Sequence, residues 1–228
     1  YSSSGEFGSG ETHEFTVTDS VTPPPTVLTN VVSGAVEEFP CPDGEFSSAG
    51  ESECTPCDPG KYATQNTEGE EVIGASECTS ADEGHFVDTQ GARNQMACPR
   101  GKHASGKGNV ECEDCEKGKY AMNESTAECE SAEPGHYVPN RAAYEQLACE
   151  PGTYAPNTGS RECFTASAGS YVETSGAVKQ IACPTGKYSG ETGQTECLNC
   201  DLGKFAKAEG TVACVAAKPG FYLSLIHI

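Results

Sequence analysis

The chain has 228 residues, of which 36% are hydrophobic, 7% are aromatic and none is Trp, so it holds too little apolar material for a large shared core. Its 14 Lys and Arg residues against 34 Asp and Glu residues give a net charge of −20, which repels nucleic-acid phosphates and anionic lipids. Because no run of about 18 apolar residues is present, we expect no nucleic-acid partner and no membrane insertion within this segment.

Fourteen cysteines stand at regular spacings along the chain. Such a density is typical of proteins that fold in oxidising compartments, because cytosolic thiols are kept reduced. We therefore expect an extracellular or cell-surface protein. The sequence begins with neither an initiator Met nor a signal peptide, which predicts a mature chain or a fragment.

Residues 1–40 contain no cysteine and begin with a Ser- and Gly-rich stretch that has little to bury. Phe15, Val17 and Val21 then alternate with polar residues, and Pro23–Pro25 favours an extended polyproline conformation. Two interpretations follow from this composition. The segment is either an extended arm that pairs with a neighbouring chain, or a Ser/Thr/Pro linker that carries O-linked glycans.

A 17-residue unit repeats along residues 41–222, which predicts a stacked array. Its fourth position is Gly in all eleven units, and its sixth is Tyr or Phe in every unit but one, which has His103. The glycine indicates a turn with positive φ or a close approach, and the aromatic residue indicates packing over the neighbouring unit. The units start at residues 41, 57, 81, 98, 115, 132, 149, 166, 183, 200 and 217.

Two segments interrupt this register. The unit that starts at Cys57 is seven residues longer than 17, and the excess lies in Thr67–Gly74, which predicts a solvent-facing acidic loop. Residues 223–228 cut the last unit short. They match one reading frame of the transposon end used in sequencing-library adapters, so we expect read-through there and leave them out of the fold.

The spacing of the cysteines predicts how they pair. A regular unit has cysteine at both its first and its fifteenth position or at neither, and the units on both sides of Cys149 have none. The nearest partner of Cys149 is therefore Cys163, inside its own unit. A bridge that closes about 15 residues contributes about 3 kcal/mol, too little to order a unit, so the units must stack. The predicted pairs are Cys41–Cys54, Cys57–Cys78, Cys98–Cys112, Cys115–Cys129, Cys149–Cys163, Cys183–Cys197 and Cys200–Cys214.

The cysteine-free units have larger apolar residues elsewhere. Their seventh position changes from Ser or Ala to Val87, Val138, Val172 or Leu223, and their sixteenth position is Met96, Leu147 or Ile181. We expect both positions to be buried, so that apolar contact replaces the covalent bridge.

The Cys-x-x-Gly-x-Tyr/Phe pattern and junctions such as Cys112-Glu-Asp-Cys115 resemble the cysteine-rich repeats of tumour necrosis factor receptors and ephrin-receptor-like modules, which also occur in protist surface proteins. The resemblance covers residues 41–222. In that family, the first cysteine of a single-disulfide module pairs with its second, which agrees with the pairing above. The multi-disulfide receptor modules are absent and the cysteine-free units depart from the pattern, so we carry over no ligand-binding role.

The remaining polar motifs predict surface features. Each Cys-x-x-Cys junction lacks a second such motif, so we expect disulfides here, with no metal site and no cofactor. His85 and His136 are interpreted as turn-surface residues. Glu before the second cysteine and Lys at the fifth position occur together in four units, which predicts exposed ion pairs. Asn123-Glu-Ser125 is an N-glycosylation sequon, and an acidic array of this kind favours diffuse calcium association.

We therefore predict a small disulfide-rich, mostly β or irregular fold: an elongated, solenoid-like stack of 17-residue modules with an extended N-terminal arm. Because no catalytic set of residues is recognisable, we expect no enzyme. The expected function is that of an extracellular structural protein, a subunit of a filament, surface coat or appendage that binds copies of itself. The alternative is the ectodomain stalk of a receptor or adhesion protein.

Overall fold

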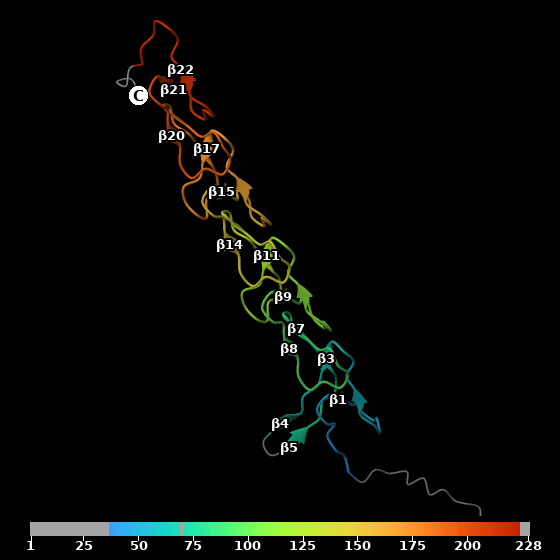
Figure 1. Ribbon diagram of the computed structural model, residues 1–228. Helices are drawn as coiled ribbons and strands as arrows, with labels where there is room; N and C mark the ends of the chain where they lie inside the picture. Colours follow the sequence, from blue (N-terminus) through green and yellow to red (C-terminus); the bar gives the residue numbers. More distant parts are fainter. Residues whose placement is uncertain (1–36, 69–70, 224–228) are drawn as a thin grey trace, which may run out of the picture. The chain divides into compact units, whose positions relative to one another are not determined.

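The computed structural model describes residues 37–68 and 71–223 (Figure 1). The chain divides into two units, Tyr1–Glu38 and Phe39–Ile228. The predicted arm therefore lies outside the described residues up to position 36, as does the predicted read-through from position 224 onward. Everything below concerns the second unit.

The described residues form short antiparallel hairpins and no helix. This confirms the predicted disulfide-rich fold of paired strands in repeated modules. The strands are β1 (Glu45–Phe46), β2 (Thr55–Pro56), β3 (Lys61–Tyr62), β4 (Asn66–Glu68), β5 (Glu71–Ile73), β6 (Thr79–Ser80), β7 (His85–Phe86), β8 (Met96–Ala97), β9 (Lys102–His103), β10 (Glu113–Asp114), β11 (Lys119–Tyr120), β12 (Glu130–Ser131), β13 (His136–Tyr137), β14 (Leu147–Ala148), β15 (Thr153–Tyr154), β16 (Phe164–Thr165), β17 (Ser170–Tyr171), β18 (Ile181–Ala182), β19 (Lys187–Tyr188), β20 (Leu198–Asn199), β21 (Lys204–Phe205) and β22 (Val215–Ala216).

Each unit up to the one that starts at Cys200 contains a β-turn followed by a two-stranded hairpin. In the unit that starts at Cys98, the Lys102 N–H donates to the Pro99 carbonyl at 3.1 Å, and Gly101 occupies the third turn position with a φ of 82°. Glycine adopts this positive φ without strain, and a type II turn requires it at this position. The fifth and sixth positions then pair with the two residues that follow the fifteenth, as β9 pairs with β10.

Backbone hydrogen bonds join each unit to the next. The Gly101 N–H donates to the Ala121 carbonyl at 2.9 Å, and the Ala104 N–H donates to the Thr126 carbonyl at 3.1 Å. In the opposite direction, the Cys115 N–H donates to the Gly101 carbonyl at 2.9 Å. The same bonds recur along the array. The stack is therefore held by backbone N–H and C=O groups, whatever the side chains are.

The turn glycine also packs against the second unit further along. A Cβ atom added at Gly118 would overlap the carbonyl oxygen of Gly159, and Gly118 has a φ of 87°. Only glycine meets both conditions. The equivalent pairs are Gly44–Gly91, Gly60–Gly108, Gly84–Ser125, Gly101–Ala142, Gly118–Gly159, Gly135–Gly176, Gly152–Gly193 and Gly169–Gly210. Each of these units therefore contacts two later units, as expected for a stacked array.

Disulfides occupy the interior of the bridged units. All fourteen cysteines are paired, each with a cysteine of its own unit, and the first cysteine of every bridge from Cys41 to Cys183 is buried. The pairs are Cys41–Cys54, Cys57–Cys78, Cys98–Cys112, Cys115–Cys129, Cys149–Cys163, Cys183–Cys197 and Cys200–Cys214.

The insertion in the second unit forms a hairpin, β4–β5, where the sequence predicted a loop. After this hairpin in the sequence, Ala75 forms a parallel bridge with Phe46, and the Ala75 carbonyl accepts a hydrogen bond from the Ser47 N–H at 3.2 Å. A Cβ atom at Gly74 would meet the backbone nitrogen of Cys41 at 2.5 Å. The residues that follow the hairpin therefore pack against the first unit.

Candidate assembly surface

Partly exposed apolar pairs repeat in the second half of the array. The sixteenth position is the first residue of the second strand, and its partner across the hairpin is the sixth position. From Leu147 to Val215 it is apolar in five successive units, with exposed fractions of 42% to 61%. Residues directly opposite in an antiparallel pair project from the same face. We name as the apolar pairs Tyr137–Leu147, Tyr154–Phe164, Tyr171–Ile181, Tyr188–Leu198 and Phe205–Val215.

The prediction that the sixteenth position is buried in the cysteine-free units is wrong. Met96, Leu147 and Ile181 are exposed by 43%, 42% and 48%. Both residues of the second strand are exposed in each of these hairpins, so this strand has no layer over it. These side chains therefore do not replace the missing disulfide.

The seventh position is buried in the three complete cysteine-free units, as predicted, but the prediction is wrong for Leu223 in the shortened last unit, which is 37% exposed. Three valines there have exposed fractions of at most 2%, and Val138 packs with Tyr120 and Ala132 in a buried cluster. A valine fills the space that Ser or Ala leaves in a bridged unit, and its burial stabilises the stack by about 1.5–3 kcal/mol relative to full exposure. The three valines are Val87, Val138 and Val172.

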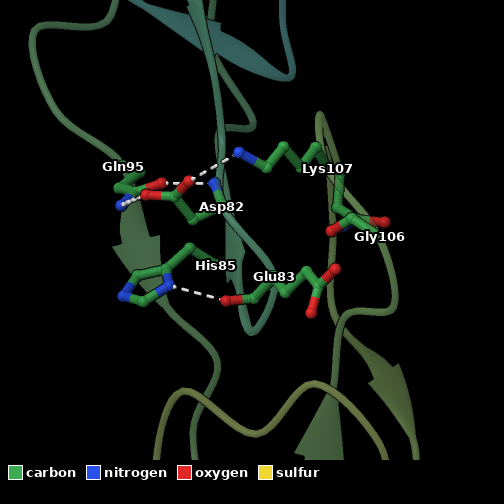
Figure 2. A network of polar contacts seen from close by, with 7 residues as sticks. Asp82, Glu83, His85, Gln95, Gly106 and Lys107 are labelled. Carbon is green, nitrogen blue, oxygen red and sulfur yellow. Dashed lines mark hydrogen bonds and ion pairs between the residues drawn. The ribbon is translucent and has the colours of Figure 1, made fainter.

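A glutamine at the fifteenth position closes each regular cysteine-free unit. Gln95 Oε1 accepts a hydrogen bond from the Asp82 N–H at 2.6 Å, and Gln95 Nε2 donates to Asp82 Oδ2 at 3.0 Å (Figure 2). The amide therefore joins the two ends that a disulfide joins elsewhere. Equivalent bonds to the backbone N–H link Gln146 to Glu133 at 2.7 Å and Gln180 to Ser167 at 2.7 Å. The sequence shows these glutamines, but we did not predict their role.

The carboxylate of Asp82 is held by two donors. The hydrogen bond from Gln95 is the main cause that lowers the pKa of Asp82, and the ammonium group of Lys107, 3.5 Å away, lowers it further (Figure 2). Both interactions favour the ionised form. The hydrogen bonds between Gln95 and Asp82 therefore depend on the charge of Asp82.

The predicted ion pairs between the Glu before the second cysteine and the Lys at the fifth position are absent among the described residues. The reason is the register of the hairpin, which places Lys102 opposite Asp114. Lys102 Nζ lies 2.7 Å from Asp114 Oδ1, and this bond lowers the pKa of Asp114. The other ion pairs of the described residues are Lys107–Asp82 and Lys204–Asp201.

The histidines occupy different surroundings. His85 Nδ1 lies 3.1 Å from the Glu83 carbonyl (Figure 2), and His136 Nδ1 lies 3.4 Å from the Pro134 carbonyl, so both bind their own turns, as predicted for surface residues. His103 lies beside the disulfide of the next unit, with a ring nitrogen and the Sγ atoms of Cys115 and Cys129 within 4.8 Å of one another. The joined sulfurs offer no thiolate, which is the ligand that zinc prefers.

The glycosylation sequon lies on an exposed turn. Asn123, Glu124 and Ser125 are all exposed. The Ser125 N–H donates to the Cys98 carbonyl at 2.9 Å, and Ser125 has a φ of 58° where most units have glycine. The side chain of Asn123 is therefore accessible on a fixed turn.

The comparisons with known proteins assign no family. No family model matches the sequence, and no curated protein matches it significantly. In the part of the chain that the structure describes, no helix is long and apolar enough to cross a membrane. The repeated hairpins and the seven in-unit disulfides nevertheless define a cysteine-rich repeat protein, and this number of disulfides indicates that it folds in an oxidising environment.

Proposed function

We propose that the protein is an extracellular structural protein, a subunit of a filament, surface coat or appendage, and that its copies join through residues 1–40 and the repeat array. The observation that carries this proposal is the series of apolar pairs, which stay 42% to 61% exposed at the sixteenth position in five successive units. We take the regular repetition of these exposed apolar pairs as the candidate contact with another protein.

The proposed occupant of this surface is the arm of another copy. Residues 15–32 combine alternating apolar residues with a proline run and carry a single charged residue, Asp19. An extended segment of this kind loses little conformational entropy when it binds. The valines of the cysteine-free units are buried within their own chain and leave no apolar surface for the arm. The apolar pairs are exposed, so the proposal places the arm on them.

The net charge predicts how salt affects the proposed apolar contact between copies. Copies with a charge of −20 repel one another, and salt screens this repulsion. Association through the apolar pairs therefore strengthens as salt is added. A contact made mainly of ion pairs weakens under the same change.

The test replaces apolar side chains at the sixteenth position. In one variant, Leu147, Phe164 and Ile181 become Ser, and in the matched control, Thr55, Glu113 and Glu130 at the equivalent position of earlier units become Ser. Sedimentation velocity measures the assembled fraction at several protein concentrations. We expect the first variant to lose assembly and the control to keep it. Equal assembly of the two variants contradicts the proposed surface.

The second candidate is the ectodomain stalk of a receptor or adhesion protein. The resemblance of the Cys-x-x-Gly-x-Tyr/Phe units to receptor and ephrin-receptor-like modules favours it. A stalk stays monomeric at every concentration in the same sedimentation experiment, so the two functions give different results. The exposed sequon at Asn123 suits either surface role, and a mass shift after treatment with an N-glycosidase tests its occupancy.

A further inference from the structure

His103 is the one residue at the sixth position that is neither Tyr nor Phe. It lies in β9, at the boundary with the following unit, whose disulfide joins Cys115 to Cys129. A ring nitrogen of His103 and the two Sγ atoms lie within 4.8 Å of one another. No other three His, Cys, Asp or Glu side chains of residues 37–68 and 71–223 bring their ligand atoms so close.

The imidazole of His103 is oriented by its own hairpin. His103 pairs with Glu113 across the two strands, and His103 Nδ1 lies 3.2 Å from the Glu113 carbonyl. A carbonyl only accepts, so Nδ1 carries the proton and Nε2 keeps its lone pair. Histidines that bind metals commonly donate their other N–H to a backbone carbonyl in this way.

The surroundings of this group attract cations. His103 and Cys129 line a surface hollow of about 420 Å³, whereas Cys115 is buried beneath it. The charged residues of its lining are Glu113, Asp114, Glu116, Glu128, Lys119 and Arg141. Four carboxylates against these two cations and Lys102, which is paired with Asp114, leave a formal charge of −1 before His103 is counted. A divalent cation is therefore drawn to the hollow, and an anionic ligand is repelled.

We propose that reduction of the Cys115–Cys129 disulfide creates a Zn²⁺ site whose ligands are the two cysteine sulfurs and His103. Two thiol groups of a reductant supply two electrons, which break the Sγ–Sγ bond, and the two protons they lose complete the thiols of Cys115 and Cys129. The two reductant sulfurs are joined in a new disulfide. Zn²⁺ then binds both sulfurs as thiolates, the two protons leave to the solvent, and water takes the fourth position.

In the proposed metal site, bound Zn²⁺ takes over the role of the Cys115–Cys129 disulfide in holding the two ends of the unit together. The stack already closes its units in two ways, by a disulfide as in Cys149–Cys163 and by an amide as in Gln95. Bound Zn²⁺ holds the first and fifteenth positions of one unit together after its bridge opens. The sequence pattern does not reveal this set, because the three ligands lie at residues 103, 115 and 129 and not within one Cys-x-x-Cys junction.

The test uses the oxidised full-length chain at neutral pH. It is equilibrated in a thiol–disulfide redox buffer, with and without Zn²⁺, and free thiols are then alkylated and mapped by peptide mass spectrometry. Zinc binds only the opened form, so Zn²⁺ at about ten times its Kd raises opening about tenfold. We expect this rise at Cys115–Cys129 and at none of the other six bridges, with one zinc per opened chain by native mass spectrometry.

The matched variant is His103→Tyr, which restores the usual residue of the sixth position and therefore keeps the fold. It is expected to remove the effect of zinc on Cys115–Cys129. Three results overturn the proposal: zinc changes the opening of no bridge, it raises all seven alike, or His103→Tyr keeps the selective rise.

Discussion

The carbonyl oxygen of Gly159 lies against the α-carbon of Gly118, although Gly159 belongs to the second unit further along the chain. Gly118 also has a φ of 87°, so the fourth position is restricted by its own backbone and by that of a distant unit. This double restriction explains the glycine in the eight units that have such a contact, and the positive φ alone favours it at Gly186, Gly203 and Gly220.

Gly118→Ala is expected to destabilise the array strongly. The positive φ alone costs about 1–2 kcal/mol, and separating the two backbones adds about 1–3 kcal/mol. Gly106→Ala is the control, because Gly106 has a φ of 73° with nothing within 4 Å of an added Cβ atom. Thermal unfolding of the disulfide-intact chain should show a larger fall in midpoint for Gly118→Ala, and equal falls would show that the contact with Gly159 is unimportant.

Val138→Asp tests whether the seventh position supports a unit that has no disulfide. Val138 is 0% exposed, so the substitution buries an unpaired charge, which costs about 3–5 kcal/mol. Val178→Asp makes the same change in another cysteine-free unit at a residue that is 45% exposed. Its effect should stay within about 0.5 kcal/mol. Limited proteolysis should cut the first variant near its cysteine-free unit, and similar resistance of the two variants would refute the supporting role.

An eighth disulfide should form when Ala132 and Gln146 are both replaced by Cys. These residues hold the first and fifteenth positions of a cysteine-free unit, and Gln146 already bonds the backbone N–H of Glu133 at 2.7 Å. A bridge that closes about 15 residues should stabilise the chain by about 3 kcal/mol. Thiol counting and peptide mapping check it. Free thiols at 132 and 146, with the seven natural bridges intact, would show that the cysteine-free units have a different geometry.

The hydrogen bonds between Gln95 and Asp82 predict that the stability of the chain depends on pH. Since the pKa of Asp82 is lowered in the folded chain, its contribution to stability is present above the unfolded value and is lost as the pH falls through the folded value. Gln95→Leu removes the hydrogen bond that is the main cause of the lowered pKa, and it should move the pKa of Asp82 up towards 3.8. Lys107→Met should also raise it, because the ammonium group lowers the pKa through its charge and its hydrogen bond. A carboxyl NMR titration measures both, and an unchanged pKa of Asp82 in Gln95→Leu would contradict the assignment.

The repeat pattern was sufficient to predict the units. Spacing alone places Cys149 with Cys163, and the structure has the same pair. The change from Ala to Val at positions such as Val138 indicates burial because a larger apolar side chain stands where the covalent bridge is missing.

The contacts across the hairpin could not be predicted in the same way. The burial of Met96 depends on whether another layer covers its strand, and the partner of Lys102 depends on the strand register, which a hairpin of two-residue strands leaves undefined in the sequence. The contact of His103 with Cys115 and Cys129 joins two units, so it follows only from the way the units stack.

The most direct test of the proposed function compares the full chain with a chain that begins at Phe39, the first residue of the repeat-containing unit. Both are purified with their seven disulfides intact and viewed by electron microscopy at the same concentration and salt. We predict filaments or ordered sheets from the full chain and single particles from the shortened chain. Assemblies of the same diameter and repeat from both chains would contradict the account, because the array alone would then carry assembly.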